Sequence, residues 1–233
     1  MHYVHFSKPA LVQSLMNGFE AFVVKHGNKK RHAIEFYGLL FGHTEETSRT
    51  VHHHVDFVSI DSSADMNGGW VQNNEDATFL KEQFAYGAGY DFLGSIHTHP
   101  YLSQEMTLPE ARTSGSHFSD SDLQNFHEQF SEDSFFGRPF SVHAVLAIRN
   151  KDDESERQRI ERDGYLEPNI FEFSLANCKC FLKAQVFSCK NGVLKREDTS
   201  LKSDYLEKFG YLEGSFGSVK LVDGKQRIVE HVA

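Results

Sequence analysis

The amino-acid sequence predicts a fold of the α/β or α+β class, because helical and strand patterns interleave along the chain. Some segments carry apolar residues three or four positions apart, which is typical of helices that pack one face on a core. Other segments are short apolar runs, continuous or alternating, which are typical of strands. With 233 residues, of which 39% are hydrophobic, the chain can bury one large core. The patterns alone do not choose between the two classes.

The first predicted elements are a helix and two strands. Ser7 followed by Pro9 is typical of a helix start, and residues 27–28 (Gly-Asn) mark its end. The apolar run 33–41 is short enough for a buried strand, and residues 51–60 alternate well enough to be its partner. The positions expected to face inward in the helix and the second strand are Leu11, Leu15, Phe19, Phe22, Val55 and Phe57.

The middle of the chain is predicted to hold a loop, a helix, a strand and a second loop. Residues 61–70 are rich in Ser, Asn and Gly, and a helix follows over about 74–86. A strand covers 90–98 and ends at Pro100. Residues 101–118 contain a proline, a glycine and several Ser and Thr residues, so we interpret them as a loop. The helix positions expected to face inward are Ala77, Leu80 and Phe84.

The remaining elements are a helix over 119–130, a strand over 140–148 and one or two strands within 170–186. The charged stretch 151–163 is predicted to be a solvated loop or an exposed helix. Residues 223–224 (Asp-Gly) lie between two apolar runs and predict a hairpin. The helix positions expected to share one side are Leu123, Phe126 and Phe130.

Composition excludes several classes of function. A net charge of -9 argues against a nucleic-acid interface, which needs clustered Lys and Arg. No stretch approaches the ~20 apolar residues of a membrane span, and residues 1–7 lack the pattern of a signal peptide. We therefore expect a cytoplasmic protein with neither nucleic acid nor membrane as a partner. Cys178, Cys180 and Cys189 are odd in number and lack a CxxC pair, which favours free thiols over disulfides or a zinc site.

Two histidines alternate along the predicted strand at 90–98. His97 and His99 are one residue apart, so both imidazoles project from the same face of a strand. Such a pair can reach one ion at ~2.0–2.1 Å, the zinc–nitrogen distance. A pair of half-buried strand histidines without a ligand is the alternative.

Two acidic residues have chemically informative positions. Asp122 lies three residues after Ser119 at a helix start, so the two can form a capping box, or Asp122 can turn toward a metal. Glu35 lies in an otherwise apolar strand, where a carboxylate is costly to bury unless it is paired, protonated or near a cation. A bend in the strand would instead expose it.

Together these segments resemble the signature of the JAMM (MPN+) metalloproteases. That signature is a Glu before a Gly-rich apolar strand, then His-Ser/Thr-His-Pro, then Ser-x-x-Asp. Here Glu35 precedes residues 38–42 (Gly-Leu-Leu-Phe-Gly), residues 97–100 read His-Thr-His-Pro, and residues 119–122 read Ser-Asp-Ser-Asp, in the same order. The resemblance covers about residues 1–150. The segment between Pro100 and the last motif is more than twice the usual length.

The resemblance implies an MPN/JAB domain, in which a curved mixed sheet is flanked by helices. This domain is expected over 1–186, with 101–118 as an inserted loop near the active site. Residues 187–233 are expected to form a C-terminal extension with the hairpin. An insertion in a surface loop costs little, because closure entropy rises slowly with loop length.

The resemblance also implies a role for each motif residue. His97, His99 and Asp122 would bind one Zn²⁺ and leave its fourth position to water, as in catalytic zinc sites. Glu35 would take the proton of that water and pass it to the leaving amine. Ser119 would hydrogen-bond the oxyanion of the reaction intermediate.

The activity implied is that of a zinc isopeptidase or peptidase that cuts after the C-terminal glycine of a ubiquitin-like protein, with other members of a conjugation system as possible partners. The alternatives are a non-catalytic MPN scaffold subunit, and a processing hydrolase for sulfur-carrier proteins or small amides. Trp70 and Tyr101 are candidates for substrate binding, whereas His117 is expected in a surface loop. The consecutive histidines 52–54 predict a solvated strand edge that could take up metal in a purified sample.

Overall fold

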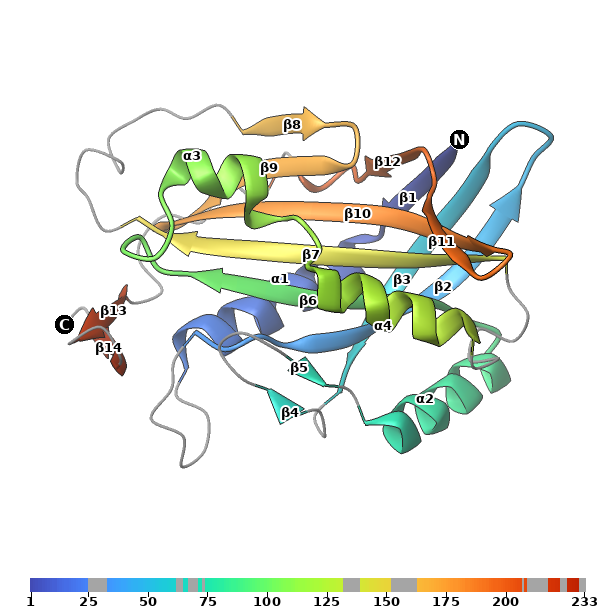
Figure 1. The fold of residues 1–233 in the computed structure, drawn as a ribbon, viewed down its shortest axis with the longest axis horizontal. Coiled ribbons are helices and arrows are strands. Elements are labelled where there is room, and N and C mark those ends of the chain that lie inside the picture. Colours follow the sequence, from blue (N-terminus) through green and yellow to red (C-terminus); the bar gives the residue numbers. More distant parts are fainter. Residues whose placement is uncertain are drawn as a thin grey trace.

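One mixed sheet of ten strands forms the centre of the computed structural model (Figure 1). The structure describes residues 1–24, 33–61, 65–66, 71–72, 74–131, 139–151, 163–206, 208, 218–222 and 226–230. In order across the sheet, the strands are β12 (Thr199–Lys202), β1 (His2–Phe6), β3 (Val51–Ile60), β2 (Tyr37–Glu46), β6 (Asp91–Tyr101), β7 (Phe140–Asn150), β10 (Cys178–Lys190), β9 (Ile170–Leu175) and β8 (Gly164–Glu167), with β11 (Val193–Arg196) also paired to β10. Only the pairs β12–β1, β1–β3 and β6–β7 are parallel among the pairs described within this sheet.

The sheet is curled and is flanked by few helices. This combination belongs to the predicted α/β or α+β class. The helices are α1 (Lys8–Val23), α2 (Glu75–Gly87), α3 (Leu108–Glu110), a π-helical turn (Ala111–Gly115) and α4 (Asp120–Ser131). Two small hairpins lie outside the main sheet: β4 (Asp65–Met66) with β5 (Val71–Gln72), and β13 (Ser218–Val222) with β14 (Gln226–Glu230). The second confirms that the two apolar runs of the predicted C-terminal hairpin pair as antiparallel strands, while the predicted turn at 223–224 lies outside the described residues. In the described part of the chain, no helix has the length and apolar character needed to span a bilayer.

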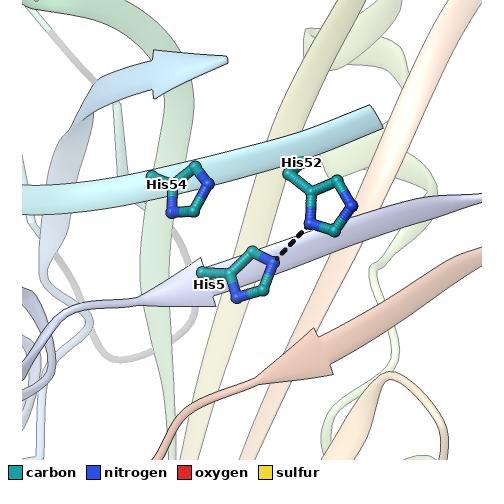
Figure 2. Close-up of side chains that lie close together, drawn as sticks. All are labelled: His5, His52 and His54. Atoms are coloured by element: carbon teal, nitrogen blue, oxygen red, sulfur yellow. Dashed lines mark hydrogen bonds between the residues drawn. The ribbon is translucent and has the colours of Figure 1, made fainter. Parts of the chain in front are cut away.

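The three consecutive histidines lie on an interior strand, so the predicted solvated edge is wrong. β3 pairs with β1 on one side and with β2 on the other. His53 faces the core and is 3% exposed, whereas His52 and His54 face the opposite way and are half-buried (Figure 2). Alternation along a strand shows which side chains share a face, but the second neighbour of β3 comes from a distant segment, residues 2–6.

Val55 and Phe57, which were expected on one face, lie on opposite faces because of a β-bulge. The register passes from the pair Phe41–Phe57 to the pair Gly42–Val55, so Asp56 has no partner in this ladder. An extra residue of this kind reverses the alternation of side chains along the strand. Val55 therefore packs in the α1 core, while Phe57 packs on Phe41.

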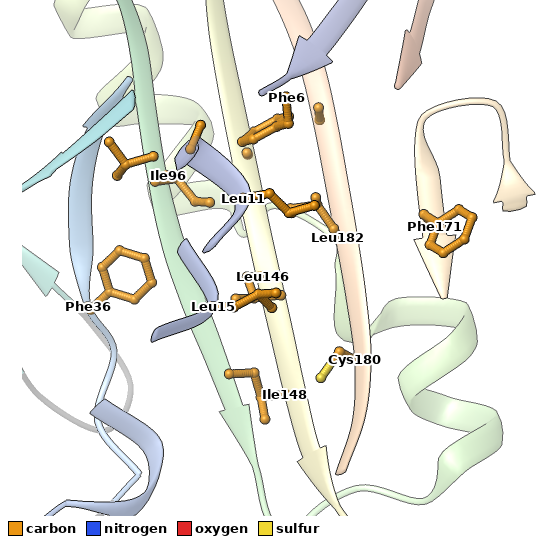
Figure 3. Packing of buried hydrophobic residues seen from close by; sticks show 14 of the residues in the cluster. Phe6, Leu11, Leu15, Phe36, Ile96, Leu146, Ile148, Phe171, Cys180 and Leu182 are labelled. Carbon is orange, nitrogen blue, oxygen red and sulfur yellow. The ribbon is translucent and has the colours of Figure 1, made fainter. Parts of the chain in front are cut away.

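Helix α1 lays its apolar stripe on one face of the sheet. Ser7 caps the helix as predicted, because its Oγ accepts a hydrogen bond from the backbone N–H of Ala10 at 3.2 Å. All four expected core positions are buried: Leu11, Leu15, Phe19 and Phe22. They belong to one cluster with residues of β6, β7 and β10 such as Ile96, Leu146 and Leu182 (Figure 3). The helix ends at Val23, with Val24 already extended, so it stops before the predicted end at 27–28, residues that the structure does not describe.

Helices α3 and α4 cover the other face of β7 and β10. The apolar side of α4 is the predicted one, and it packs on the sheet together with Phe118. Its cluster holds Leu123, Phe126, Phe130, Val145, Phe187 and Leu194. The predicted loop 101–118 instead contains the end of β6, α3 and the π-helical turn. A capping box between Thr107 and Glu110 begins α3, a signal that the loop interpretation passed over.

The inward face predicted for α2 is wrong, although its limits are close to the predicted ones. Leu80 is 57% exposed and Phe84 is 74% exposed, while Glu82 and Ala85 are buried. Lys81, on the inner side, donates a hydrogen bond to the carbonyl of Ile60. The helix lies at the margin of the sheet, where polar side chains reach backbone groups of the neighbouring strand, and apolar spacing alone does not reveal this.

Three predicted boundaries shift in the structure. β2 begins at Tyr37 and not at residue 33, so Glu35 precedes the strand. β6 continues through Pro100, where its described ladder is with β7 alone, and a proline is tolerated in a strand that pairs on one side. The boundary expected between 186 and 187 falls inside β10, and β11 and β12 beyond it join the main sheet.

At Gly94, the strand that carries the two histidines passes so close to β7 that there is no space for a side chain. Its φ is +145°, and a Cβ added there would lie 1.9 Å from the carbonyl oxygen of Val142. We expect Gly94→Ala to lower the free energy of unfolding by more than about 4 kcal/mol in urea titrations, because both conformation and space forbid a side chain. Gly164→Ala is the matched control, since nothing lies within 4 Å of its Cβ position. Equal losses in the two variants would contradict the expectation.

Candidate metal centre

The end of β6 presents two imidazoles to one point. His97 and His99 lie on one face of this strand, and their Nε2 atoms are 3.1 Å apart. Asp122, at the start of α4, brings its Oδ1 to 3.5 Å from His97 Nε2. One ligand atom from each of the three residues lies within 4.8 Å of the others. Ligand atoms around a tetrahedral zinc ion are about 3.4 Å apart, given bonds of about 2.0–2.1 Å, so the spacing fits one small cation.

The two carboxylate oxygens of Asp122 have different surroundings. Its Oδ2 accepts hydrogen bonds from the backbone N–H of Ser119 at 2.7 Å and from the Ser119 hydroxyl at 2.8 Å. The Asp122 N–H in turn donates to Ser119 Oγ at 3.1 Å, which completes a capping box. The other oxygen, Oδ1, remains turned toward His97. The two oxygens of one carboxylate thus divide helix capping and the candidate ligand position between them.

The second ring nitrogen of His99 is held by the segment that the sequence suggested as an insertion. His99 Nδ1 lies 3.0 Å from the carbonyl oxygen of Gly115, at the end of the π-helical turn. Tyr101 donates its hydroxyl to the same oxygen at 3.1 Å. A carbonyl that accepts from Nδ1–H leaves the Nε2 lone pair of His99 directed to the centre, the usual arrangement around metal-binding histidines. Sequence reasoning missed Gly115, because a backbone acceptor leaves no residue-type signal.

Thr98, between the two histidines, fixes the segment that carries Glu35. The Thr98 N–H donates to the carbonyl of Phe36 at 3.2 Å, and Thr98 Oγ1 accepts from the Phe36 N–H at 2.9 Å. The charges of His97 and Asp122 both act on the Glu35 carboxyl, so it lies close to the candidate centre. Glu35 is only 9% exposed. Its side chain is therefore a buried carboxyl at the candidate centre, and the bend before β2 does not expose it.

Burial controls the protonation of this group of residues. It raises the pKa of Glu35 to about 7, although His97 acts in the opposite direction. Burial, with the neighbouring His97, also lowers the pKa of His99 to about 4, so that ring is neutral at pH 7. Burial would raise the pKa of Asp122, but hydrogen bonds from His97 and Ser119 outweigh it and hold that pKa well below its usual range. The result is a neutral imidazole, an ionised carboxylate and a carboxyl that exchanges its proton near neutral pH.

His143 of β7 connects the strand of the two histidines to the helix of Asp122, and sequence reasoning missed it. Its Nδ1 lies 2.9 Å from Ser95 Oγ, and its Nε2 lies 3.0 Å from Ser141 Oγ. The ring stacks on Phe126 of α4 with 3.6 Å between centroids. Because α4 also carries Asp122, this stack helps to set the position of the carboxylate. Alternation in β7 assigns His143 to the same face as the centre, but no pattern in the sequence names Phe126 as its partner.

Of the other candidate residues, only Tyr101 lies beside the candidate centre among those that the structure describes. Tyr101 is half-buried beside His99, and burial raises its pKa to about 12. His117 is exposed, as expected. Trp70 lies outside the described residues. Among the described residues, no group able to hold a metal includes a cysteine, and the thiols of Cys178, Cys180 and Cys189 form no disulfide.

Comparisons with known proteins add little to this geometry. No protein-family model matches the chain, and no curated protein matches it. Among solved structures, it is similar to the solution structure of protein DSY2949 from Desulfitobacterium hafniense, with 13% sequence identity and a TM-score of 0.44. That match covers 86% of this chain and 94% of the other. A similarity of this size carries no argument about function.

Proposed function

We propose that the chain is a zinc-dependent peptidase or isopeptidase of the JAMM type, with an MPN-like fold, that cuts after the C-terminal glycine of a ubiquitin-like protein. The observation that supports it best is the convergence of His97, His99 and Asp122 beside a buried Glu35 whose pKa is raised to about 7. These residues come from three distant segments of the chain. Convergence of a ligand set with a tuned proton carrier is typical of hydrolytic sites.

The donor set fits zinc. Two imidazole nitrogens and one carboxylate oxygen are common zinc ligands, and three protein ligands leave a coordination position open. When bound, zinc supplies Lewis-acid chemistry and lowers the pKa of water from 15.7 to about 7. The Gly115 carbonyl on His99 and the Ser119 contacts to Asp122 would orient two of the three ligands.

Two side chains of this chain would handle the reacting groups. Glu35 would take a proton from the attacking water on its carboxylate and return it to the leaving amine, and a pKa of about 7 suits both transfers near neutral pH. Ser119 Oγ is at the surface and now donates to Asp122 Oδ2. Rotation of that hydroxyl would let it donate to the substrate carbonyl oxygen, while the Ser119 backbone N–H continues to hold Asp122.

The class of substrate rests on the resemblance of the three motifs to JAMM proteases. We expect the chain, loaded with zinc, to cleave fusions of ubiquitin-like proteins directly after their C-terminal glycine, as read by mass spectrometry of the products. A chelator should stop cleavage, and added zinc should restore it. A panel of several ubiquitin-like fusions, a short peptide with the same junction and a small amide distinguishes an isopeptidase from a general amidase. Cleavage that persists in chelator and in Asp122→Ala would overturn the proposal, as would inactivity toward the whole panel in the zinc-loaded protein.

A further inference from the structure

A second group of histidines lies on the sheet, on β1, β3 and β2, away from the centre on β6. In the strand registers, His54 of β3 is directly opposite His5 of β1 on one side and His43 of β2 on the other. His52, two residues before His54, projects from the same face. These rings come from three strands, yet they share one patch of the sheet. Their juxtaposition depends on the pairing of β1 with β3, which the sequence did not reveal.

Three of the rings converge closely. His5 Nε2 lies 3.0 Å from His52 Nδ1, and the rings of His5 and His54 stack with 4.6 Å between centroids (Figure 2). One nitrogen from each of His5, His52 and His54 lies within 4.8 Å of the other two. All three side chains are half-buried, so they are held by their neighbours but can be reached from solution. The 3.0 Å between the His5 and His52 nitrogens is close to the 3.1 Å between the two imidazoles on β6.

The surroundings leave nitrogen lone pairs for a ligand. His52 Nε2 lies 3.1 Å from Thr50 Oγ1, and a hydrogen bond donated there leaves the Nδ1 lone pair directed at His5. His54 Nε2 is buried and has no hydrogen-bond partner among the described residues. The nearby acid, Glu45, keeps its Oε2 3.7 Å from that nitrogen. A buried polar atom without a partner is uncommon in folded proteins and points to a ligand or water.

The protonation state also suits metal binding, because metals bind neutral imidazole. Burial, with the adjacent His54 and His52, lowers the pKa of His5 to about 4. Burial and His43 lower the pKa of His54 as well. Both rings are therefore neutral at physiological pH.

We propose that His5, His52 and His54 bind one divalent late-transition-metal cation, such as Zn²⁺, Ni²⁺ or Cu²⁺, at a site separate from His97, His99 and Asp122. An all-imidazole donor set suits these ions and does not suit Ca²⁺ or Mg²⁺, which take oxygen ligands. Bound there, the cation bridges β1 and β3. The proposal does not depend on the chain being a peptidase.

A neighbouring group of side chains also contains His54 and is the main alternative site for the cation. His43, Glu45 and His54 also lie close enough to hold a metal. In that group, however, His43 Nε2 and Glu45 Oε1 are 3.8 Å apart, and the Glu45 side chain is 66% exposed. His5 and His52 are already at hydrogen-bond distance, so less rearrangement is needed to close the ligand set around an ion. We therefore assign the cation to the group with His5.

The test uses the full chain, stripped with chelator, with zinc alone as the probe. In a His97→Gln background, which removes one ligand of the centre on β6, native mass spectrometry and calorimetric titration should find one bound zinc. Adding His5→Gln or His52→Gln should weaken that binding at least tenfold, while His43→Gln and the distant His127→Gln should leave it unchanged. Circular dichroism of each variant confirms that it is folded.

A second measurement needs no substitution at the site. Imidazole ¹⁵N signals of the wild-type chain should show zinc-dependent shifts for His5, His52 and His54. Loss of zinc in His43→Gln with full retention in His5→Gln would overturn the assignment in favour of the neighbouring group. Unchanged ring signals, with no zinc in the His97→Gln background, would show that the cluster is only packed histidines.

Discussion

Glu35→Gln will lower the rate of amide cleavage by about 10²–10⁴-fold, the usual contribution of a positioned general acid–base group. Gln has the size of Glu but cannot carry a proton, and the buried position of Glu35 leaves no room for solvent to replace it easily. The zinc content should stay at the wild-type value, because Glu35 is not among the three candidate ligands. Steady-state rates on the best substrate of the panel, with metal analysis of the same samples, measure both effects. Full activity in this variant would remove Glu35 from the mechanism.

The same variant gives an independent pH signature in the metal-free protein. The pKa of Glu35 is about 7 in the folded chain, against an ordinary value of 4.5. Between these values the folded state binds more protons than the unfolded state, so Glu35 makes the free energy of unfolding fall as pH rises from 4.5 to 7. Glu35→Gln lacks this decline, and its stability relative to wild type should rise over that window by about 3 kcal/mol. Unfolding curves that keep a constant difference across the window would contradict the raised pKa.

Asp122→Ala will weaken zinc binding at the centre on β6 by at least about 10²-fold. Removing a residue that only hydrogen-bonds to a metal ligand typically lowers metal affinity by about 10–100-fold, and removing a ligand should cost more. Activity should fall with the zinc affinity. The variant also loses the carboxylate that caps α4. Its free energy of unfolding should therefore be about 0.5–2 kcal/mol below that of the wild type, the usual contribution of a helix cap. Competition against a chromogenic chelator measures the affinity, and urea titration measures the stability.

Ser119→Ala separates the two roles of Asp122. It removes the hydroxyl that donates to Asp122 Oδ2 and accepts from the Asp122 N–H, but it leaves the carboxylate in place. We expect a similar loss of stability with a much smaller loss of zinc affinity than in Asp122→Ala. Comparable zinc affinity in Asp122→Ala and wild type would show that Oδ1 is not a ligand atom.

Spacing could predict which side chains of the candidate centre share a face, whereas their grouping as one ligand set came from the resemblance to the JAMM signature. His97 and His99 share a face through strand alternation, and Ser119 with Asp122 share a helix start. What spacing could not supply was the choice between capping and ligand binding at Asp122. The orientation of the carboxylate shows that Oδ2 caps the helix while Oδ1 faces His97, so capping does not exclude a ligand position.

The parts of the fold that sequence reasoning missed depend on contacts between distant segments. The bulge at Asp56 reverses the facing of Phe57, and it exists only in the pairing with β2. The inner side of the helix α2 holds Glu82, although the helical spacing of its apolar residues predicts a different inner side. The Gly115 carbonyl beside His99 likewise comes from a segment sixteen residues away in the chain. Local patterns identify elements, but partners across the sheet decide which of their sides is buried.

The place of β1 between β3 and β12 has a consequence for how the protein is made. During translation, residues 2–6 leave the ribosome before residues 51–55, and they can pair with β3 as soon as that segment follows. Their other side pairs with residues 199–202, which are synthesised almost 200 residues later. Until then, the nascent chain carries an open strand edge, the kind of surface that attracts other strands. We therefore expect chaperones that bind emerging chains to bind at this edge until β12 pairs with β1.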